Sequence, residues 1–412
     1  MNVLYIVPYT PNPIRVRPYQ LIRALARRGH RVTLATVWEN AREKQELDEF
    51  IKNGVDVIAA PLTKQQRIYN SLRTLPTALP VQANFCRSPQ LLRSVGLRLN
   101  AHAQELDIVH TEHLRGAEYG VWLLDQMQAH GLRKRIPVVW DSVDCISYLF
   151  EQAVRYNSAS PIRRMIMRLE LGRTRRYEGR MANRFDRVLV TSQADRQALL
   201  DLSGGTAPVS VLSNGVELAH FVPADRLRHP DTVVFSGKMS YHANVAAALY
   251  LATQVMPVVW EKKPSVRLII AGSQPAPAIR QLAESQPERV TVTGRIPDMR
   301  QPLQEASVSA APLLYGAGIQ NKVLEAMACA TPVVASSRAL AALTVQPGKD
   351  CLVADTPAAF ADALLRLLND DTLCGQIGAA GRRYVERNHD WGRIGAALDD
   401  IYCSVIRTTA SS

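Results

Sequence analysis

Residues 315–336 read YGAGIQNKVLEAMACATPVVAS, and the rest of the chain is organised around this stretch. It begins as a glycine-containing loop, a short helix is expected from about Asn321, and residues 331–335 have the composition of a buried strand. A glycine loop that leads into a helix presents backbone N–H groups and the positive end of the helix dipole, which together hold phosphate. The stretch therefore predicts a loop–helix–strand unit of an α/β domain with a phosphate-binding loop.

Two charged side chains share one face of this expected helix. Lys322 lies in its first turn, and Glu325 follows three residues later. A cation beside a phosphate and a carboxylate that accepts ribose hydroxyl groups suit a nucleotide-linked ligand. The same two residues would also suit a surface ion pair on an ordinary α/β helix, and the stretch alone leaves both interpretations open.

Apolar runs of strand length recur along the whole chain, with helical segments between them. The expected strands are 2–7, 31–36, 55–59, 107–111, 137–140, 187–191, 208–212, 232–236, 266–271, 289–293, 307–312, 331–335 and 351–354. This alternation predicts parallel sheets covered by helices, and 412 residues are too many for one ordinary core. Because Asn214-Gly215 is a strong turn signal, we place an N-terminal Rossmann-like domain at 1–212 and a second one from 213.

The composition indicates a globular protein that attracts polyanions. Hydrophobic residues make up 47% of the chain, the net charge is +12 and the pI is about 9.6. Six scattered cysteines lack metal-ligand spacing, so we expect reduced, mostly buried thiols in a cytosolic protein. The chain opens directly with a strand and has no run of 18 consecutive apolar residues, so we expect neither a signal peptide nor a membrane span.

The most basic region is 161–187, with nine arginines against three acidic residues. Ile162, Ile166 and Leu169 share one helical face, and arginines fill much of the remainder. Such a helix, or helix pair, suits an anionic membrane surface, although a solvated helix packed on its own domain has the same pattern. No interleaved aromatic platform, recognition helix or zinc module is present in the sequence, so we expect no nucleic-acid partner.

Polar residues collect where expected strands end, which is the side of an open α/β sheet that binds ligands. Arg15 and Arg17 follow the first strand and suit either an anionic acceptor or solvent. Glu112 and His113 leave the strand 107–111, whereas His110 lies within it and is expected to be a core histidine.

Three segments of the second half carry a resemblance: LSNGVELAHF at 212–221, FSGKMSYHAN at 235–244 and GIQNKVLEAMACATPVVAS at 318–336. Together with the opening of the chain they resemble the retaining glycosyltransferases of family 4, the group 1 type. The resemblance covers nearly the whole chain and is closest to sugar transferases of bacterial exopolysaccharide and exosortase systems. It implies the GT-B fold, with two Rossmann-like domains facing an inter-domain cleft. It further implies a nucleotide-sugar domain at 213–390 and a final helix at 391–412 that crosses back to the first domain.

The resemblance also implies the donor site. The pair Gly237-Lys238 stands where the family places a cation on the donor pyrophosphate, while residues 241–244 lack a second family lysine that Lys322 is expected to replace. Glu325 matches the ribose-binding glutamate, but Ala317 stands where the family has another carboxylate. The expected donor-binding residues are Gly237, Lys238, Arg295, Ile319, Gln320, Asn321, Lys322 and Glu325.

In the first domain, Glu112 occupies the register of a family histidine that touches the reacting sugar, and His113 follows it. The sequence does not choose between these two catalytic candidates. Arg15 and Arg17 are the expected acceptor-binding residues. No Asp-x-Asp motif stands at a donor position, so no essential metal and no cofactor are expected.

The expected function is transfer of a sugar from a nucleoside-diphosphate sugar to a lipid-linked or saccharide acceptor, with retention, in cell-surface polysaccharide biosynthesis. The alternatives are a GT-B sugar-nucleotide epimerase and a non-catalytic nucleotide-sugar-binding protein. The expected location is the cytoplasm, with peripheral contact at the inner face of the membrane as the further option.

Overall fold

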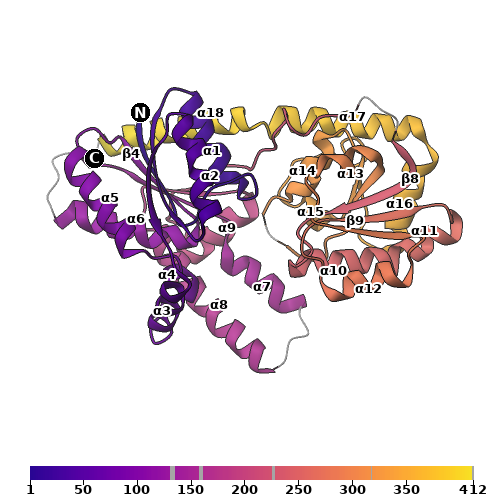
Figure 1. The fold of residues 1–412 in the computed structure, drawn as a ribbon, viewed down its shortest axis with the longest axis horizontal. Coiled ribbons are helices and arrows are strands. Elements are labelled where there is room, and N and C mark those ends of the chain that lie inside the picture. The colour runs from indigo at the N-terminus through magenta and orange to yellow at the C-terminus, as the bar shows by residue number, and fades with distance from the viewer. Residues whose placement is uncertain (130–134, 157–160, 225–227, 317, 411–412) are drawn as a thin grey trace. The chain divides into compact units, whose positions relative to one another are not determined.

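The computed structural model describes residues 1–129, 135–156, 161–224, 228–316 and 318–410. The chain divides into two compact units. Unit 1 consists of Met1–Ser213 together with Trp391–Ser412, and unit 2 consists of Asn214–Asp390. Each unit contains a parallel β-sheet flanked by helices (Figure 1). The expected α/β fold with two Rossmann-like domains is confirmed.

Unit 1 holds a seven-stranded sheet in the order β3-β2-β1-β4-β5-β6-β7. Its strands are β1 (Asn2–Val7), β2 (Arg31–Trp38), β3 (Asp56–Pro61), β4 (Ile108–Glu112), β5 (Val138–Val143), β6 (Arg187–Val190) and β7 (Val209–Val211). Its helices are α1 (Val16–Arg27), α2 (Ala41–Lys52), α3 (Lys64–Thr74), α4 (Val81–Asn84), α5 (Pro89–His102), α6 (His113–Ala129), α7 (Ile146–Tyr156), α8 (Pro161–Ala182), α9 (Gln193–Leu202) and α18 (Trp391–Ala410). The strand order reverses between β1 and β4, so the carboxyl ends of these two strands form the ligand-binding switch point of the sheet.

Strand β1 shows why the central strands of unit 1 read as continuous apolar runs. Val3, Tyr5 and Val7 are buried in the core layer on one face of the sheet, and Leu4 and Ile6 are buried in the layer on the other face. A parallel strand covered on both faces needs apolar side chains at every position. The run 2–7 therefore specifies a central strand and not an edge strand.

Unit 2 holds a six-stranded sheet in the order β10-β9-β8-β11-β12-β13. Its strands are β8 (His229–Ser236), β9 (Arg267–Ala271), β10 (Val290–Gly294), β11 (Ala306–Ala311), β12 (Val333–Ala335) and β13 (Leu352–Val353). Its helices are α10 (His242–Tyr250), a π-helical turn (Leu251–Val255), α11 (Met256–Lys262), α12 (Pro277–Ser285), α13 (Arg300–Glu305), α14 (Asn321–Ala328), α15 (Ser337–Leu340), α16 (Pro357–Asn369) and α17 (Asp371–Asn388). The order reverses between β8 and β11, which makes their carboxyl ends the switch point of unit 2.

One helix of unit 2 has the length and composition to cross a membrane. It runs over His242–Lys262, and 56% of its most apolar window is buried inside the unit. Ala247, Leu251 and Val255 belong to the core cluster of unit 2. Core helices of soluble proteins pass the same test, so this helix is weak grounds for a membrane span.

The last helix, α18, completes the core of unit 1. Leu398 and Tyr402 are buried in the same cluster as Leu21 of α1. The two helices approach closely at Gly395, where an added Cβ would lie 2.5 Å from the Cβ atom of Ala24. A side chain at this position would force the two helices apart.

The basic segment 161–187 forms one helix, α8, and then continues through a turn into β6. Its second half packs on unit 1, because Tyr177, Met181 and Phe185 are buried. In its first half Ile166 and Leu169 are exposed. The side chain of Ile162, the third member of the expected apolar face, lies outside the described part of the chain.

Candidate functional site

Two glycines shape the strand ends beside the switch point of unit 2. Gly237 follows β8, and its N–H donates to the carbonyl oxygen of Ala271 at 3.0 Å. Gly272 follows β9 with φ +150°, and an added Cβ there would lie 1.7 Å from the Gly237 carbonyl oxygen. A larger residue at 272 would overlap the backbone of Gly237, and a Cβ on Gly237 would meet the Asn244 side chain at 2.8 Å. This close approach fixes the backbone that carries Lys238.

Lys322 lies directly beside this glycine loop. Its Cε atom is 3.3 Å from the place that a Cβ on Gly237 would occupy, and its Nζ donates to Oε1 of Gln320 at 3.2 Å. Lys238, by contrast, is exposed, and its carbonyl oxygen accepts from the Asn244 side chain at 3.0 Å. The structure therefore brings Gly237, Lys238, Gln320 and Lys322 together around one strand end.

Burial perturbs both charged residues of α14. It lowers the pKa of Lys322 to about 8, an effect that Glu325 opposes. It raises the pKa of Glu325 to about 7, an effect that Lys322 opposes. A solvated surface pair would keep ordinary pKa values. Both side chains are half-buried, and Lys322 lies beside a loop suited to phosphate, so their environment favours the ligand-binding interpretation.

A second contact at this switch point has no counterpart in the sequence reasoning. His242, in the first turn of α10, shares a hydrogen bond of 2.9 Å between its Nδ1 and the hydroxyl of Tyr315. The two rings also stack, with centroids 5.4 Å apart and planes at 11°. The contact joins α10 to the loop before α14. In the sequence, the only indication of this contact is that Tyr241-His242 lies in the segment where the family has its second lysine.

The other expected donor residues are less closely tied to this cluster. Ile319 packs against the core of unit 2, and Asn321 is the exposed first residue of α14. Arg295 is exposed beyond the end of β10, two strands from β8 in the sheet. Ala317, the expected site of a missing carboxylate, lies outside the described residues.

At the switch point of unit 1, Glu112 is buried at the end of β4. Its two carboxyl oxygens accept hydrogen bonds from Tyr5, at 3.1 Å, and from Tyr9, at 2.8 Å. Burial raises the pKa of Glu112 to about 8, and the charge of Asp141 acts in the same direction. Glu112 is only 1% exposed and is already bonded, so it is placed to orient the two tyrosines.

His113 is the more accessible of the two catalytic candidates. It begins α6 with a φ of +65°, an uncommon backbone conformation for a non-glycine residue and one that concentrates at functional sites. Burial and the nearby Arg115 lower its pKa to about 3, so its imidazole is neutral. Its Nδ1 accepts from the N–H of Arg115 at 3.4 Å, which assigns the proton to Nε2. His113 thus offers a neutral N–H donor at the strand end.

Arg17 does not have the exposed position that an acceptor-binding residue needs. It is 5% exposed and binds both carboxylate oxygens of Asp141, at 2.8 and 3.1 Å. Its Nη1 also donates to the carbonyl oxygens of Leu212 and Ser213. Its guanidinium group is therefore used within unit 1, where it holds the end of β7 against β5.

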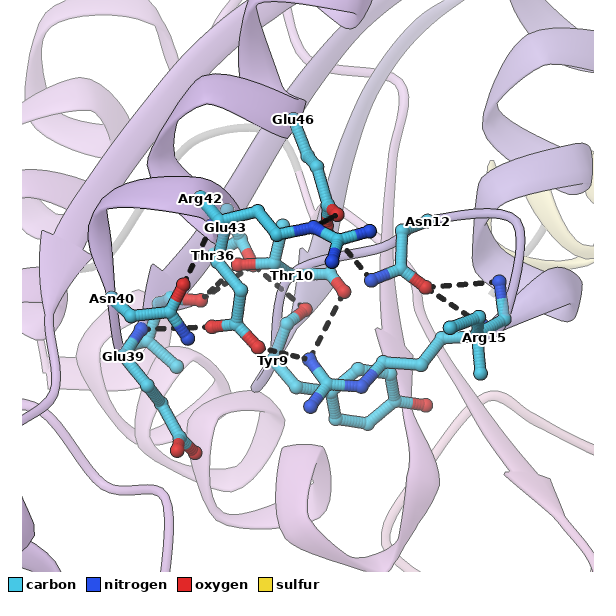
Figure 2. Close-up of polar contacts among 12 residues, drawn as sticks. Tyr9, Thr10, Asn12, Arg15, Thr36, Glu39, Asn40, Arg42, Glu43 and Glu46 are labelled. Carbon is cyan, nitrogen blue, oxygen red and sulfur yellow. Dashed lines mark hydrogen bonds and ion pairs between the residues drawn. The ribbon is translucent and has the colours of Figure 1, made fainter. Parts of the chain in front are cut away.

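Arg15 keeps a partly exposed side chain, and Figure 2 shows it reaching toward Thr10 and the ring of Tyr9. Its Nη1 donates to the Thr10 carbonyl oxygen at 3.1 Å and lies 3.3 Å from Glu43. Its guanidinium carbon lies 5.1 Å from the ring centroid of Tyr9, whose hydroxyl in turn bonds to Glu112. Of the two expected acceptor-binding arginines, Arg15 is the one with room to contact a ligand.

His110 is fully buried, as expected for a core histidine. Its ring stacks on Tyr5 at 4.0 Å, and its Nδ1 shares a 2.7 Å hydrogen bond with the hydroxyl of Tyr402. Burial lowers its pKa well below the usual value, so the imidazole is neutral. The residue links β4 to α18.

Two family models match the chain, one in each unit. The model of the glycosyl transferase 4-like domain matches residues 14–215, and that of glycosyl transferases group 1 matches residues 230–370. The chain belongs to the group 1 glycosyltransferases. The family assignment agrees with the desolvated cation and carboxylate at the switch point of unit 2.

Curated relatives of this glycosyltransferase include mannosyltransferases. The phosphatidyl-myo-inositol mannosyltransferase of Mycobacterium leprae is 28% identical over 224 residues, which are 51% of this chain and 59% of the relative. The GDP-mannose-dependent monoacylated alpha-(1-6)-phosphatidylinositol monomannoside mannosyltransferase of Corynebacterium glutamicum is 32% identical over 158 residues, 36% of this chain and 42% of the relative. The chain thus spans at most about three fifths of the length of these two relatives.

Solved structures show that the glycosyltransferase has the GT-B fold. Sucrose-phosphate synthase from Thermosynechococcus elongatus superposes with a TM-score of 0.68 at 18% identity, over 99% of this chain and all of that one. Anabaena Alr3699/HepE, solved in complex with UDP, gives a TM-score of 0.67 at 16% identity, over 98% of this chain and all of that one.

Proposed function

We propose that this glycosyltransferase moves a sugar from a nucleoside-diphosphate sugar to a lipid-linked or saccharide acceptor, with retention of configuration at the sugar. The observation that carries the proposal is the position of Lys322 beside the Gly237 loop, with Glu325 half-buried one helical turn further along α14. The complex of Alr3699/HepE with UDP and the mannosyltransferase relatives support a nucleotide-sugar donor and a lipid acceptor.

In this proposal the donor diphosphate lies over the Gly237 loop. Lys322 and the exposed Lys238 balance its negative charge, and the carboxylate of Glu325 accepts hydrogen bonds from the ribose hydroxyl groups. As the glycosidic bond to the diphosphate breaks, charge accumulates on the departing phosphate oxygens. Fixed cations in a partly desolvated site stabilise this charge more than water does. The two lysines supply the charge stabilisation, and we propose that no essential metal takes part.

In unit 1 we propose that His113 donates its Nε2–H to the reacting sugar or acceptor, and that Glu112 orients Tyr5 and Tyr9. With a neutral imidazole and a buried, bonded carboxyl group, neither residue is set up as a nucleophile. The acceptor hydroxyl then attacks the anomeric carbon from the face that the diphosphate leaves, and its proton passes to the departing phosphate oxygen, so the chemistry depends on positioning. This route retains configuration without a covalent enzyme intermediate.

We further propose a role in cell-surface polysaccharide biosynthesis at the cytoplasmic side of the membrane. The motif resemblance to bacterial exopolysaccharide sugar transferases supports the first part. For the second, the six cysteines are free thiols and four of them are buried, which suits a reducing compartment. The basic helix α8 supplies a surface for anionic lipid.

The test measures donor binding and turnover separately. Calorimetric titration with UDP and with GDP identifies the nucleotide, and Lys322→Met should weaken binding by about tenfold or more, since it removes a charge-assisted contact. Lys262→Met, at an exposed ion pair of unit 2 with Asp362, is the matched control and should bind like the wild type. A Lys238→Met/Lys322→Met double variant that binds normally would refute the donor site.

Turnover is followed with nucleotide sugars and a membrane lipid extract as acceptor. Release of free nucleoside diphosphate together with a glycosylated lipid of unchanged anomeric configuration is the expected result. Isomerised nucleotide sugar formed without any acceptor would instead indicate an epimerase.

A further inference from the structure

The large apolar side chains that the described part of the chain exposes are concentrated on two helices of unit 1. On α3 and the residue after it, Ile68, Tyr69, Leu72 and Leu75 are each more than half exposed. Ile68, Leu72 and Leu75 follow the i, i+4, i+7 spacing of one helical face. Exposed apolar residues in such a cluster mark an interaction surface, whereas single ones need no explanation.

The first half of α8 continues this exposure. Met165, Ile166 and Leu169 are each more than half exposed, and their spacing of three and four residues places them on neighbouring positions of the helix surface. The second half of the same helix is buried against unit 1 through Tyr177 and Met181. The apolar residues in the second half of α8 therefore pack within unit 1, whereas those in its first half do not.

Hydrogen bonds attach the α3 segment to α8. Nη2 of Arg173 donates to the carbonyl oxygen of Leu75 at 2.8 Å, and the N–H of Val81 donates to Oε2 of Glu170 at 3.1 Å. Arg173 and Glu170 are themselves paired at 3.0 Å. The exposed ends of the two helices are thus parts of one built surface, which we call the α3–α8 surface, and both extend from the same part of unit 1 in Figure 1.

The charge that α3 and α8 themselves carry is mostly positive. Helix α3 contains no acidic residue, and the sequence has none between Asp56 and Glu105. The acidic residues of α8 are Glu170, which is paired with Arg173, and Glu178, which is buried and accepts the N–H groups of Ile146 and Ser147.

Exposed cations stand on the same two helices. They are Lys64, Arg73, Arg168, Arg175 and Arg176. Apolar side chains that can enter the acyl boundary, with cations at headgroup level, are the combination that binds an anionic bilayer. A protein partner would need an acidic rim matched to these positions, whereas an anionic bilayer offers negative charge everywhere.

We propose that the α3–α8 surface docks unit 1 on an anionic lipid bilayer, with the aliphatic side chains of both helices inserted and the surrounding arginines and lysine on the headgroups. This inference rests on the proposed function and deepens it, because it assigns the membrane contact to a pair of helices and not to the basic segment 161–187 alone. The Phe85 ring lies between Arg67 of α3, at 5.6 Å, and Arg115 of α6, at 5.5 Å. These contacts connect α3 to the first turn of α6, which His113 begins.

The test is flotation of the full-length protein with vesicles of phosphatidylcholine alone and with vesicles enriched in phosphatidylglycerol. The wild type should bind the second kind, and added salt should weaken the binding. Leu72→Ser/Leu169→Ser should reduce the partition coefficient by about tenfold or more, since two inserted aliphatic side chains are lost. Arg73→Gln/Arg168→Gln/Arg175→Gln should abolish the preference for anionic lipid.

Matched controls separate this surface from general effects. Leu97→Ser removes an exposed aliphatic residue from α5, and Arg280→Gln/Arg366→Gln removes exposed cations from unit 2; both should bind vesicles like the wild type. Circular dichroism and calorimetric UDP or GDP binding are measured on every variant to show that the fold is kept.

Three outcomes would overturn the inference: a wild type that ignores anionic vesicles, surface variants that bind as well as the controls, or a wild-type dimer in light scattering that these variants dissociate. The last result would identify the surface as a contact between copies of the chain. If vesicles bind normally but no nucleoside diphosphate binds, the proposed function fails while the docking surface stands.

Discussion

Lys322 combines two properties that conflict in a folded protein. An ammonium group near partly buried apolar surface is destabilised, and its pKa of about 8 reflects that cost. The chain nevertheless keeps it beside the Gly237 loop, with Gln320 as its hydrogen-bond acceptor. A bound diphosphate would stabilise the charged form, so ligand binding and protonation of Lys322 are thermodynamically linked.

This linkage predicts that donor affinity falls at alkaline pH. Because the pKa of Lys322 in the free protein is lowered to about 8, the side chain is charged below that pH and loses its proton above it. The dissociation constant of UDP or GDP should therefore rise by up to about tenfold per pH unit above pH 8. Lys322→Arg, which stays charged, should remove this dependence, and a wild-type profile that is flat through this range would contradict the assignment.

Glu112 predicts a pH dependence of stability. Its pKa is about 8 in the folded protein and near 4.5 in an unfolded chain. Between these two pH values the folded protein keeps a proton on Glu112 that unfolding releases. Its stabilising contribution is present below pH 4.5 and is lost as the pH rises to about 8, by up to about 1.4 kcal/mol per pH unit. Glu112→Gln should flatten the free energy of unfolding of unit 1 in this range.

Urea unfolding across that pH range checks this. Glu284→Gln, at an exposed position on α12, is the control and should leave the slope unchanged. An equal slope in wild type and Glu112→Gln would show that Glu112 is ionised at neutral pH.

At the scale of secondary-structure elements, the backbones of the loops after β8 and β9 are so close that the contact leaves no room for a side chain at Gly272. Gly272→Ala should cost about 2 to 4 kcal/mol of stability, since the new Cβ would overlap the Gly237 carbonyl and the backbone conformation disfavours a side chain. It should also weaken nucleotide binding, because the Gly237 loop must move. Gly348→Ala, where φ is also positive but no atom lies within 4 Å, should cost only about 1 kcal/mol.

Thermal unfolding and calorimetric UDP or GDP titration of both variants separate the two causes. If Gly348→Ala proves as damaging as Gly272→Ala, backbone strain and not loop contact is responsible.

The elements were predictable from sequence because buried parallel strands carry a local signal. Every expected strand has its counterpart, from β1 (Asn2–Val7) to β13 (Leu352–Val353), since continuous apolar runs are required wherever helices cover both faces. The basic segment 161–187 fitted one helix or a helix pair, because its apolar face changes from exposed to buried along the length of α8.

The candidate site was predictable only where its residues are close in sequence. Lys322 and Glu325 lie within one helix turn, so their spacing in the sequence predicts that they share one face of the helix. Glu112 and Tyr5, 107 residues apart, meet through the pairing of β1 with β4, which no local pattern reveals. Arg17 was expected to face a ligand for the same reason, since nothing near it in the sequence shows that Asp141 lies beside it.

At the scale of the whole molecule, unit 1 depends on a helix that is distant in sequence. The hydroxyl of Tyr402 satisfies the buried Nδ1 of His110, and its removal would leave that nitrogen without a partner. Tyr402→Phe should therefore destabilise unit 1 by about 1 to 3 kcal/mol. Hydrogen exchange of β4 and α1 should report the loss, while the strands of unit 2 keep their protection.

The reciprocal variant is Tyr384→Phe, which removes a hydroxyl that meets Nε2 of His389 at 3.0 Å within unit 2. It should lower protection in unit 2 and spare unit 1. Equal effects of both variants on both units would mean that the two unfold as one cooperative body.

The position of α18 also affects how the protein is made. During synthesis the first 213 residues emerge without Trp391–Ala410, so the face of α1 around Leu21 has no cover until all of unit 2 has been translated. At cellular translation speeds this interval is roughly 10 to 40 s. Unit 2 is continuous in sequence and can complete its fold meanwhile. The nascent N-terminal segment should therefore be the part that recruits chaperones, and ribosomes that stall before residue 391 should release an aggregation-prone fragment.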